Sequence, residues 1–256
     1  MTQTPQRADG IGAVKHAEAM RLTETENARL LAQLRNLTDE QWQAPTDCTG
    51  WNVRDVAVHL IASAQAQANP VEFARQALAG RRLMPEIGGE HWVDGLNAAQ
   101  LRARTSWTPA VLPDFWERHS AAALKARRRM PAPVRALPLL PIGTGLGVRI
   151  GWQPLAYLFD MGFTRDVWMH RIDVARATGT APELTPEHDG RIVADILREW
   201  SRRHGQPYTL ALTGPAGGEF RAGDGGEPQR VDAVEFVRIL SGRAEGPGIL
   251  RHKLPL

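Results

Sequence analysis

Cysteine and long apolar runs are what this sequence has least of. Cys48 is the single cysteine of the chain, which excludes an internal disulfide and is typical of a reducing cytoplasm. No uninterrupted apolar run approaches the roughly 18 residues that a membrane-spanning helix needs. Residues 1–10 are polar and have no apolar segment of the kind that a secretory signal carries. These absences predict a soluble, cytoplasmic protein that does not bind a membrane.

An excess of one charge is also missing. The net charge is only +3, Arg is spread along the chain, and the run Arg127-Arg128-Arg129 is typical of a solvated helix end. The sequence has no zinc-finger spacing and no alternation of basic and aromatic residues, so nucleic acid is not an expected partner. With 43% hydrophobic and 23% charged residues, the composition is that of a globular protein, and 256 residues suffice for one large or two modest domains.

The segment from Pro45 to Leu60 contains a complete helix start and ends beside an isolated histidine. Thr49-Gly50 predicts a turn, while Asn52 and Asp55 predict an N-cap and the acid of a first helical turn. The apolar residues that follow recur every three or four positions, and His59 lies at the edge of that stripe. Its imidazole is therefore expected to point inward, either as a core histidine satisfied by a carbonyl or as a group that faces a cleft.

A second segment, Phe163 to Gly179, predicts a helix that ends at Gly179. Asp166 and His170 lie one turn apart on a face that also carries aromatic rings. Side chains at this spacing converge on one point, and a histidine from another helix would complete a two-histidine, one-carboxylate set with open positions, as catalytic Zn²⁺ and related ions use. The alternative is a structural pair in which Asp166 accepts a hydrogen bond from His170.

The order of these residues resembles a known family. The residues that carry the resemblance are Trp42, Pro45-Thr46, Cys48, Gly50-Trp51, Val53-Arg54-Asp55, His59-Leu60, His170-Arg171, Asp173 and Ala175-Arg176-Ala177. They are similar to the mycothiol-dependent maleylpyruvate isomerase family, which belongs to the broader DinB/YfiT-like superfamily of metal-binding helical bundles. The similarity covers most of the chain.

The resemblance implies a metal site and a thiol cofactor. In that family a histidine of the second bundle helix and a Glu-x-x-x-His pair of the fourth bind a divalent metal, usually zinc. The corresponding ligands in this sequence are His59, Asp166 and His170, so that an Asp, one methylene shorter, stands in place of the Glu. The metal activates the thiol of a small cofactor, which is mycothiol or a similar low-molecular-weight thiol.

The activity implied by the resemblance is that of an isomerase or an S-transferase acting on a small electrophilic substrate. A thiol that enters an open coordination position loses its proton, which makes it a nucleophile at neutral pH. Two other functions stay open at this point: a ligand-binding or assembly protein without turnover, and a metal-dependent hydrolase whose open position holds water. Cys48 itself is expected to be a small turn residue rather than a catalytic thiol.

Four further side chains are candidates for the catalytic machinery. Arg243 is expected to hold a substrate carboxylate, or else to be a surface charge at a helix end. Arg171 and Arg176 are further candidates for the same role. Asp173 is expected to orient a ligand histidine, or else to pair with Arg176 or Arg54. The sequence indicates neither the substrate nor the oligomeric state.

The predicted fold class is α+β, with an up-down four-helix bundle in residues 1–180 and a small α+β domain with antiparallel strands in 181–256. The second domain resembles a sterol-carrier-like module. Residues 81–95 and 131–151 are expected to be loops, the latter a linker or lid that contains Gly143-Thr144-Gly145-Leu146-Gly147 and lacks the ending of a P-loop. The remaining elements are predicted helices at 11–37, 53–68, 71–79, 96–105, 110–130, 154–178, 185–204 and 231–241, strands at 207–213 and 219–222, and a short edge strand at the end of the chain.

Overall fold

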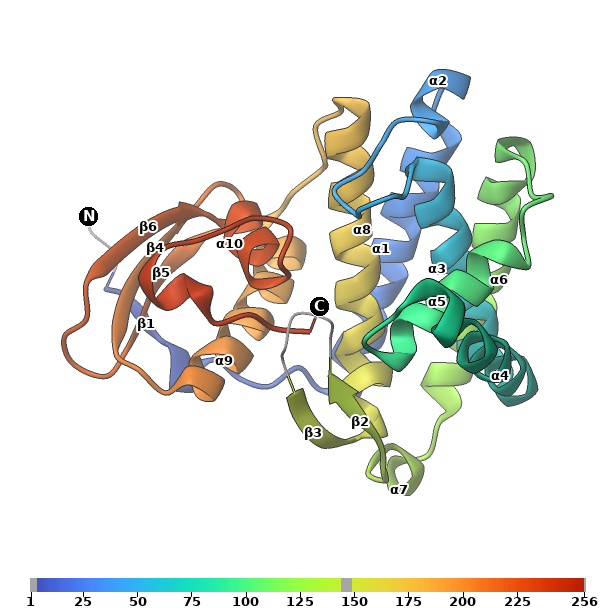
Figure 1. Cartoon of the computed structure of the whole chain (residues 1–256). Coiled ribbons are helices and arrows are strands. Elements are labelled where there is room, and N and C mark those ends of the chain that lie inside the picture. The colour runs from blue at the N-terminus through green and yellow to red at the C-terminus, as the bar shows by residue number, and fades with distance from the viewer. Residues whose placement is uncertain (1–3, 144–148, 256) are drawn as a thin grey trace. The chain divides into compact units, whose positions relative to one another are not determined.

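The computed structural model describes residues 4–143 and 149–255 and divides the chain into two compact units (Figure 1). The helical unit is His16–Pro182, and the second unit combines Met1–Lys15 with Glu183–Leu256. The N-terminal residues, expected in the bundle domain, group with the C-terminal unit because the strand β1 (Gln6–Arg7) pairs with β5 (Gly218–Ala222).

The helical unit contains four long helices that pack against one another: α1 (His16–Arg35), α3 (Val53–Ala68), α6 (Leu112–Arg129) and α8 (Phe163–Thr178) (Figure 1). Helix α1 packs against α6 and α8, and α3 packs against the same two helices. Helices that follow one another in the bundle, α1 and α3 or α6 and α8, therefore lie mainly across a diagonal. This arrangement places α3 directly beside α8, the two helices that carry the candidate ligands.

Helix starts follow the predicted caps. The Asn52 side chain accepts a hydrogen bond from the Asp55 amide, and the Asp55 carboxylate accepts one from the Asn52 amide, which forms a reciprocal capping box. Thr38 and Gln41 form the same motif at the short helix α2 (Asp39–Trp42). Helix α1 begins later than expected, at His16, and α8 begins at Phe163 after a π-helical turn over Tyr157–Gly162.

Helix α3 is buried on all sides, with ten of its residues in the core. One side meets α6 and α8, and the other meets α4 (Pro70–Ile87) and α5 (Trp92–Arg102). The expected loop over 81–95 was wrong, because α4 continues to Ile87 and α5 begins at Trp92. The two helices approach so closely at Gly80 and Gly95 that a Cβ at either position would overlap the backbone of the other helix. This packing outweighs the weak local helix preference of the segment.

The expected linker over 131–151 was also wrong in part. It contains the short helix α7 (Ala132–Arg135) and an antiparallel hairpin of β2 (Pro138–Gly143) and β3 (Arg149–Pro154). Prolines at 138, 141 and 154 argue against strands in the sequence, although a two-stranded hairpin accommodates them. The glycine string from Gly143 to Gly147 lies outside the described residues after its first member.

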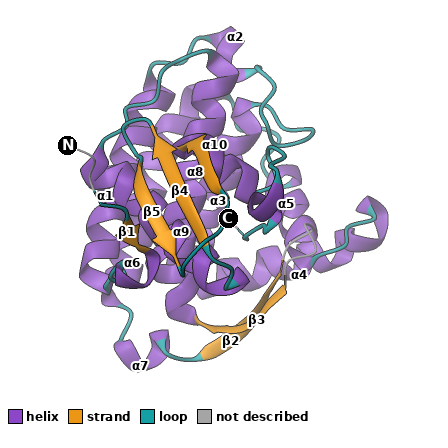
Figure 2. Ribbon diagram, turned by 90° about the vertical axis from the view of Figure 1, so that its left-hand side faces the viewer, coloured by secondary structure: helices purple, strands orange, loops and turns teal. Residues whose placement is uncertain are grey.

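The C-terminal unit contains a four-stranded sheet (Figure 2). Its order is β1, β5, β4 (Tyr208–Thr213) and β6 (Pro228–Asp232). The predicted antiparallel pairing of β4 with β5 is confirmed, but β1 with β5 and β4 with β6 are parallel, so the sheet is mixed. Two helices accompany it, α9 (Arg191–His204) and α10 (Ala233–Leu240).

Two predictions for the C-terminal unit were wrong: the residue at which the last helix begins and the kind of element at the end of the chain. Val231 and Asp232, expected to open the last helix, belong to β6, and Asp232 caps α10 through its side chain. The end of the chain forms a 3-10 turn over Gly248–Arg251 rather than an edge strand. Thr185 caps the segment that follows, because its side chain accepts a hydrogen bond from the His188 amide at the start of a π-helical turn.

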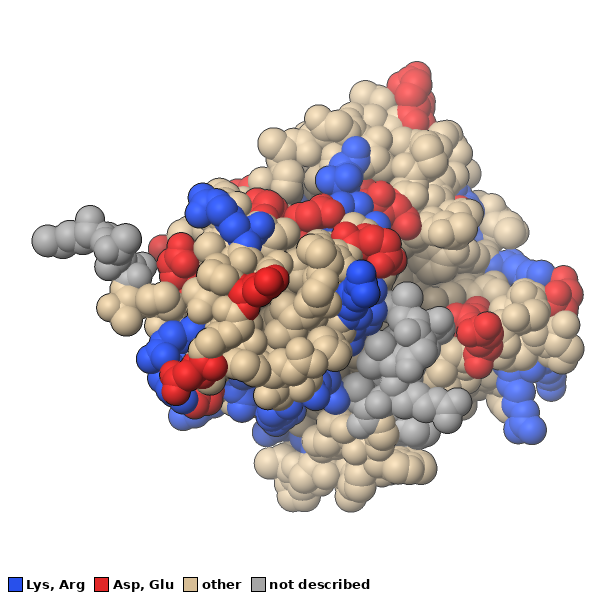
Figure 3. Space-filling model, turned by 60° about the vertical axis from the view of Figure 1, so that its left-hand side comes forward, with Lys and Arg blue, Asp and Glu red and all other residues tan. Residues whose placement is uncertain are grey.

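On the face drawn in Figure 3, Lys and Arg are interspersed with Asp and Glu. The described part of that face therefore has mixed charge. None of the described helices is long and apolar enough to cross a membrane.

Candidate metal site in the helical unit

The structure brings together three side chains from two helices of the bundle. His59 projects from α3, and Asp166 and His170 project from successive turns of α8. The His59 Nε2 atom lies 3.7 Å from Asp166 Oδ2, and the His170 Nε2 atom lies 3.5 Å from Asp166 Oδ1. One ligand atom from each of the three lies within 4.8 Å of the others. The convergence expected from the spacing is therefore present in the fold.

Aromatic rings enclose this group. The His59 and His170 rings meet edge to face, with centroids 5.2 Å apart. The Trp51 ring lies 5.2 Å from the His59 ring and stacks with the His170 ring at 6.3 Å. Both histidines are buried, whereas the Asp166 side chain retains 27% exposure. Solvent or a small ligand therefore reaches the group from the carboxylate side.

Asp173 orients the His170 ring. Its Oδ2 atom lies 2.9 Å from His170 Nδ1, and the residue is completely buried. A buried carboxylate accepts the Nδ1 proton, which leaves the lone pair of His170 on Nε2, the atom that faces Asp166. The other expected partners of Asp173 bond elsewhere: Arg176 donates to Asp47, and Arg54 donates to Asp55 and to backbone carbonyls.

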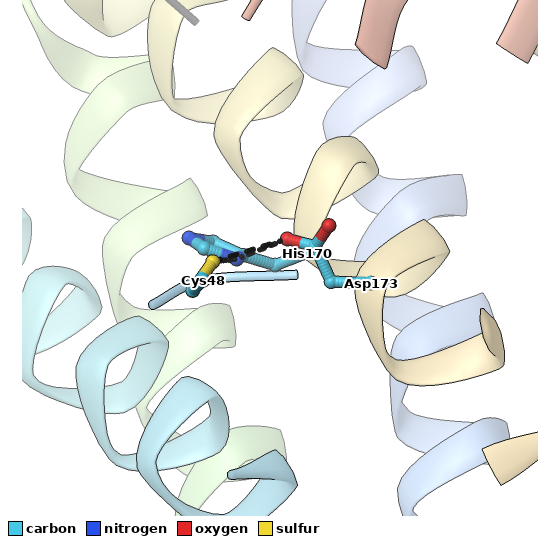
Figure 4. A group of neighbouring side chains, drawn as sticks. All are labelled: Cys48, His170 and Asp173. Atoms are coloured by element: carbon cyan, nitrogen blue, oxygen red, sulfur yellow. Dashed lines mark hydrogen bonds and ion pairs between the residues drawn. The ribbon is translucent and has the colours of Figure 1, made fainter. Parts of the chain in front are cut away.

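Cys48 lies beside this pair (Figure 4). Its sulfur is 3.5 Å from Asp173 Oδ2 and 3.8 Å from His170 Nδ1. The contact was not predictable from the sequence, because Cys48, in the turn before α3, and His170, in the middle of α8, are far apart in the chain. The geometry is that of a thiol that donates weakly to a carboxylate already shared with His170.

Gln100 is the partner that sequence reasoning missed. Its Oε1 atom lies 2.8 Å from His59 Nδ1, and it is buried on α5. A glutamine in the middle of a helix carries no signal of such a role, and α5 was expected to begin four residues later than it does. The two histidines therefore both have an acceptor at Nδ1 and both direct Nε2 toward Asp166.

The donor set fits a divalent metal ion. The Nε2 atoms of both imidazoles and a carboxylate oxygen of Asp166 face one another, so three atoms that can bind a cation lie within 4.8 Å of one another. Such an arrangement is stabilised by a cation, and two histidines with one carboxylate are ligands that zinc prefers in sites with an open position. The hydrogen-bonded second atoms of both histidines are also what zinc sites use to hold their ligands.

The candidate arginines differ in their surroundings. Arg171 is buried and bonds through Nε to the buried carboxylate of Glu26, so its guanidinium does not face the group around Asp166 as a substrate anchor would. Arg176 is half exposed and paired with Asp47. Arg243 follows the end of α10 in the C-terminal unit, where its amide donates to the Arg238 carbonyl. Its role toward a substrate stays a prediction.

The family model for the mycothiol maleylpyruvate isomerase N-terminal domain matches residues 23–175. The chain belongs to this family. The matched range contains His59, Asp166, His170, Asp173 and Cys48, and it confirms the resemblance inferred from the sequence. No curated protein matches the chain.

Two solved structures share the fold of this family member. One is a mycothiol-dependent maleylpyruvate isomerase, with a TM-score of 0.54 and 16% identity over 90% of both chains. The other is a histidine-to-alanine mutant of a mycothiol-dependent maleylpyruvate isomerase, with a TM-score of 0.53 and 17% identity, again over 90% of both chains. At this level of identity the likeness establishes the fold, including the α+β class.

Proposed function

We propose that this protein is a metal-dependent isomerase that uses a small-molecule thiol, mycothiol or a close analogue, to act on an electrophilic substrate. The observation that carries the proposal is the meeting of His59, Asp166 and His170 with three acceptor atoms facing one another. Membership of the mycothiol maleylpyruvate isomerase family supports the choice of thiol and of reaction.

In this proposal His59, Asp166 and His170 hold the metal, with zinc the best match to their donor atoms. The bound metal and thiol together would supply a thiolate nucleophile at neutral pH, which a free thiol does not provide. Asp173 and Trp51 are proposed to position the two ligand histidines. Asp173 fixes the ring of His170, and Trp51 covers the two imidazoles on one side and excludes water there.

The same site serves two related reactions. An isomerase releases the thiol after the double bond has rotated, whereas an S-transferase leaves the thiol attached to the product. Arg243 is proposed to hold a carboxylate of the substrate, because a guanidinium binds a carboxylate through two parallel hydrogen bonds. The family favours isomerisation, and the fate of the thiol distinguishes the two reactions experimentally.

The experiment that tests the proposal compares the native chain with His59→Ala and His119→Ala. His119 is a half-buried histidine of the same unit that lies outside the group around Asp166, so its replacement is the matched control. We expect about one zinc ion per native chain after expression in zinc-replete medium, the same in His119→Ala, and little in His59→Ala.

Activity is measured with maleylpyruvate and mycothiol, with glutathione as a second thiol. We expect thiol-dependent isomerisation by the native chain and His119→Ala, with no net consumption of thiol. Stoichiometric loss of thiol would instead indicate an S-transferase, and turnover without thiol a hydrolase. A native chain that stays free of metal and inactive would contradict the proposal and indicate a binding protein.

A further inference from the structure

A chain of buried hydrogen bonds runs from His59 away from Asp166, through α5 and α4. His59 Nδ1 meets Gln100 Oε1 at 2.8 Å, and Gln100 Nε2 donates to Gln76 Oε1 at 2.9 Å. Gln76 Nε2 in turn donates to Glu72 Oε1 at 2.8 Å and to the Ala62 carbonyl at 3.0 Å. Gln100 and Gln76 are 2% and 1% exposed, so water does not compete for these groups.

The outer end of this chain fixes its direction. A carboxylate and a backbone carbonyl only accept hydrogen bonds, so Gln76 must turn its NH₂ group toward Glu72 and Ala62. Its oxygen then faces Gln100, which must answer with its own NH₂ group. The oxygen of Gln100 is therefore the atom that meets His59, and His59 must carry its proton on Nδ1.

Glu72 is held as an acceptor by two arginines. Arg75 donates to both of its oxygens, at 2.7 and 2.6 Å, and the buried Arg104 donates to Oε1 at 2.9 Å. The hydrogen bonds from Arg75 lower the pKa of Glu72 to about 2, against the cost of its burial and with further help from Gln76 and Arg104. The carboxylate is therefore ionised at neutral pH.

The direction of these hydrogen bonds matters because His59 has a possible partner at each ring nitrogen, Gln100 at Nδ1 and Asp166 at Nε2. With its proton on Nε2, His59 would direct that N–H toward Asp166, 3.7 Å away, and the lone pair on Nδ1 would point at Gln100. With its proton on Nδ1, the lone pair points at Asp166 and is free for a cation. A neutral histidine in isolation takes either form, so the partner at Nδ1 decides between them.

We propose that Gln100 and Gln76 are positioning residues that hold His59 in the tautomer with a free Nε2 lone pair. Glu72, on α4, sets the donor-to-acceptor direction of the hydrogen bonds that join these residues. Helices α4 and α5 lie between α3 and α6 in the chain and are not among the four bundle helices. On this inference, their function is to orient His59, the proposed metal ligand on α3. The tautomer is a property of the metal-free chain; only its consequence for metal affinity rests on the proposed function.

The first test reads the tautomer directly. Nitrogen-15 spectra of histidine side chains in the full chain, freed of metal and held near pH 8, above the ordinary pKa of about 6.5 for histidine, distinguish a protonated from an unprotonated ring nitrogen. The His59 signals are assigned by their loss in His59→Gln. We expect the proton on Nδ1 in the native chain. A proton on Nε2 would overturn the inference, whether or not the chain binds metal.

The second test removes the hydrogen bonds of each glutamine in turn. In Gln100→Met and Gln76→Met we expect His59 to move toward the Nε2 tautomer, with the larger change in Gln100→Met. The matched control is Gln65→Met, since Gln65 also bonds to side chains of the helical unit, Arg104 and His119, but is not on the path from Glu72 to His59. An unchanged tautomer in Gln100→Met, or the same change in Gln65→Met, would overturn the inference.

Zinc affinity, measured by competition with a chromogenic chelator, provides the readout for the site. We expect Gln100→Met to weaken zinc binding by about 10- to 100-fold and Gln65→Met to leave it unchanged, as for other partners of metal-bound histidines. If a variant does not fold, the tautomer of the native chain still decides the inference. If the native protein shows the proton on Nδ1 of His59 but binds no zinc, the inference about the tautomer is supported and the proposed function is contradicted.

Discussion

The Nε2 atom of His59 lies 3.7 Å from the Oδ2 atom of Asp166, and its Nδ1 atom lies 2.8 Å from Gln100 Oε1 on the other side of the ring. The two residues come from α3 and α8, which are adjacent in the bundle although they are far apart in the chain. Two acceptors at this distance repel one another unless a cation or a proton lies between them. This relationship underlies the first prediction.

Two replacements of Asp166 test separately the need for its carboxylate and the effect of its side-chain length. Asp166→Ala removes a proposed ligand, so we expect zinc affinity to fall by more than about 100-fold, beyond the effect of losing an outer partner. Asp166→Glu keeps the carboxylate and restores the residue that the family carries at this position, so we expect zinc to remain bound. Chelator competition measures both. Equal affinity in the native chain and Asp166→Ala would remove Asp166 from the site.

Asp173→Asn tests the orientation of His170. An amide in place of the buried carboxylate binds the Nδ1 proton less strongly, so we expect kcat/KM of the thiol-dependent reaction to fall by about 10- to 100-fold. Cys48→Ala is the control, because the thiol is a weak donor to the same carboxylate and its loss leaves the pair with His170 intact. We expect less than about a threefold change there. A larger loss in Cys48→Ala than in Asp173→Asn would show that the thiol, rather than the carboxylate, is essential.

Gly95→Ala tests the close approach of α4 and α5. A Cβ at Gly95 would overlap the carbonyl oxygen of Gly80 and lie 2.9 Å from the Met84 sulfur, so the helices must separate. We expect the free energy of unfolding to fall by about 2 kcal/mol or more, as for other overpacked sites, with weaker zinc binding because Gln76 and Gln100 move apart. Gly12→Ala, where a Cβ meets nothing within 4 Å, is the control. Urea unfolding that is unchanged in Gly95→Ala would contradict the packing.

His204 makes the C-terminal unit sensitive to acid. Burial, with a smaller effect of His252, lowers the pKa of His204 to about 4. The unfolded chain protonates this histidine below about pH 6.5. Between pH 6.5 and 4 the unfolded state therefore binds more protons than the folded state, and stability falls as the pH falls.

We expect the C-terminal unit to lose about 1 to 2 kcal/mol between pH 7.5 and 5 through this group, a value reduced for the partial exposure of the ring. His204→Phe removes the titration and should flatten the dependence, although it also removes the hydrogen bond from the Gln206 amide and lowers stability at every pH. Urea unfolding at the two pH values, followed by tryptophan fluorescence, measures the difference. Parallel losses in the native chain and the variant would exclude His204 as the source.

Much of the local structure was predictable because it depends on neighbours in the chain. The capping boxes at Asn52 and Thr38, the end of α8 at Gly179 and the antiparallel strands β4 and β5 follow from residues a few positions apart. The position of β6 was not predictable in this way, since Val231 has the same apolar character in a strand as in a helix. Its parallel pairing with β4 is a contact between distant segments.

The sequence by itself determined the helix caps, the apolar stripes and the one-turn spacing of Asp166 and His170, because hydrogen bonding and side-chain direction over one or two turns depend only on nearby residues. With the family pattern it also indicated His59 as their companion. Only the tertiary structure decided that Gln100 and Gln76 stand behind His59, that Cys48 and Asp173 stand behind His170, and that α4 and α5 are joined through Gly80 and Gly95. These relationships join segments far apart in the chain, and a buried amide shows in which direction it bonds only when both of its partners are in place.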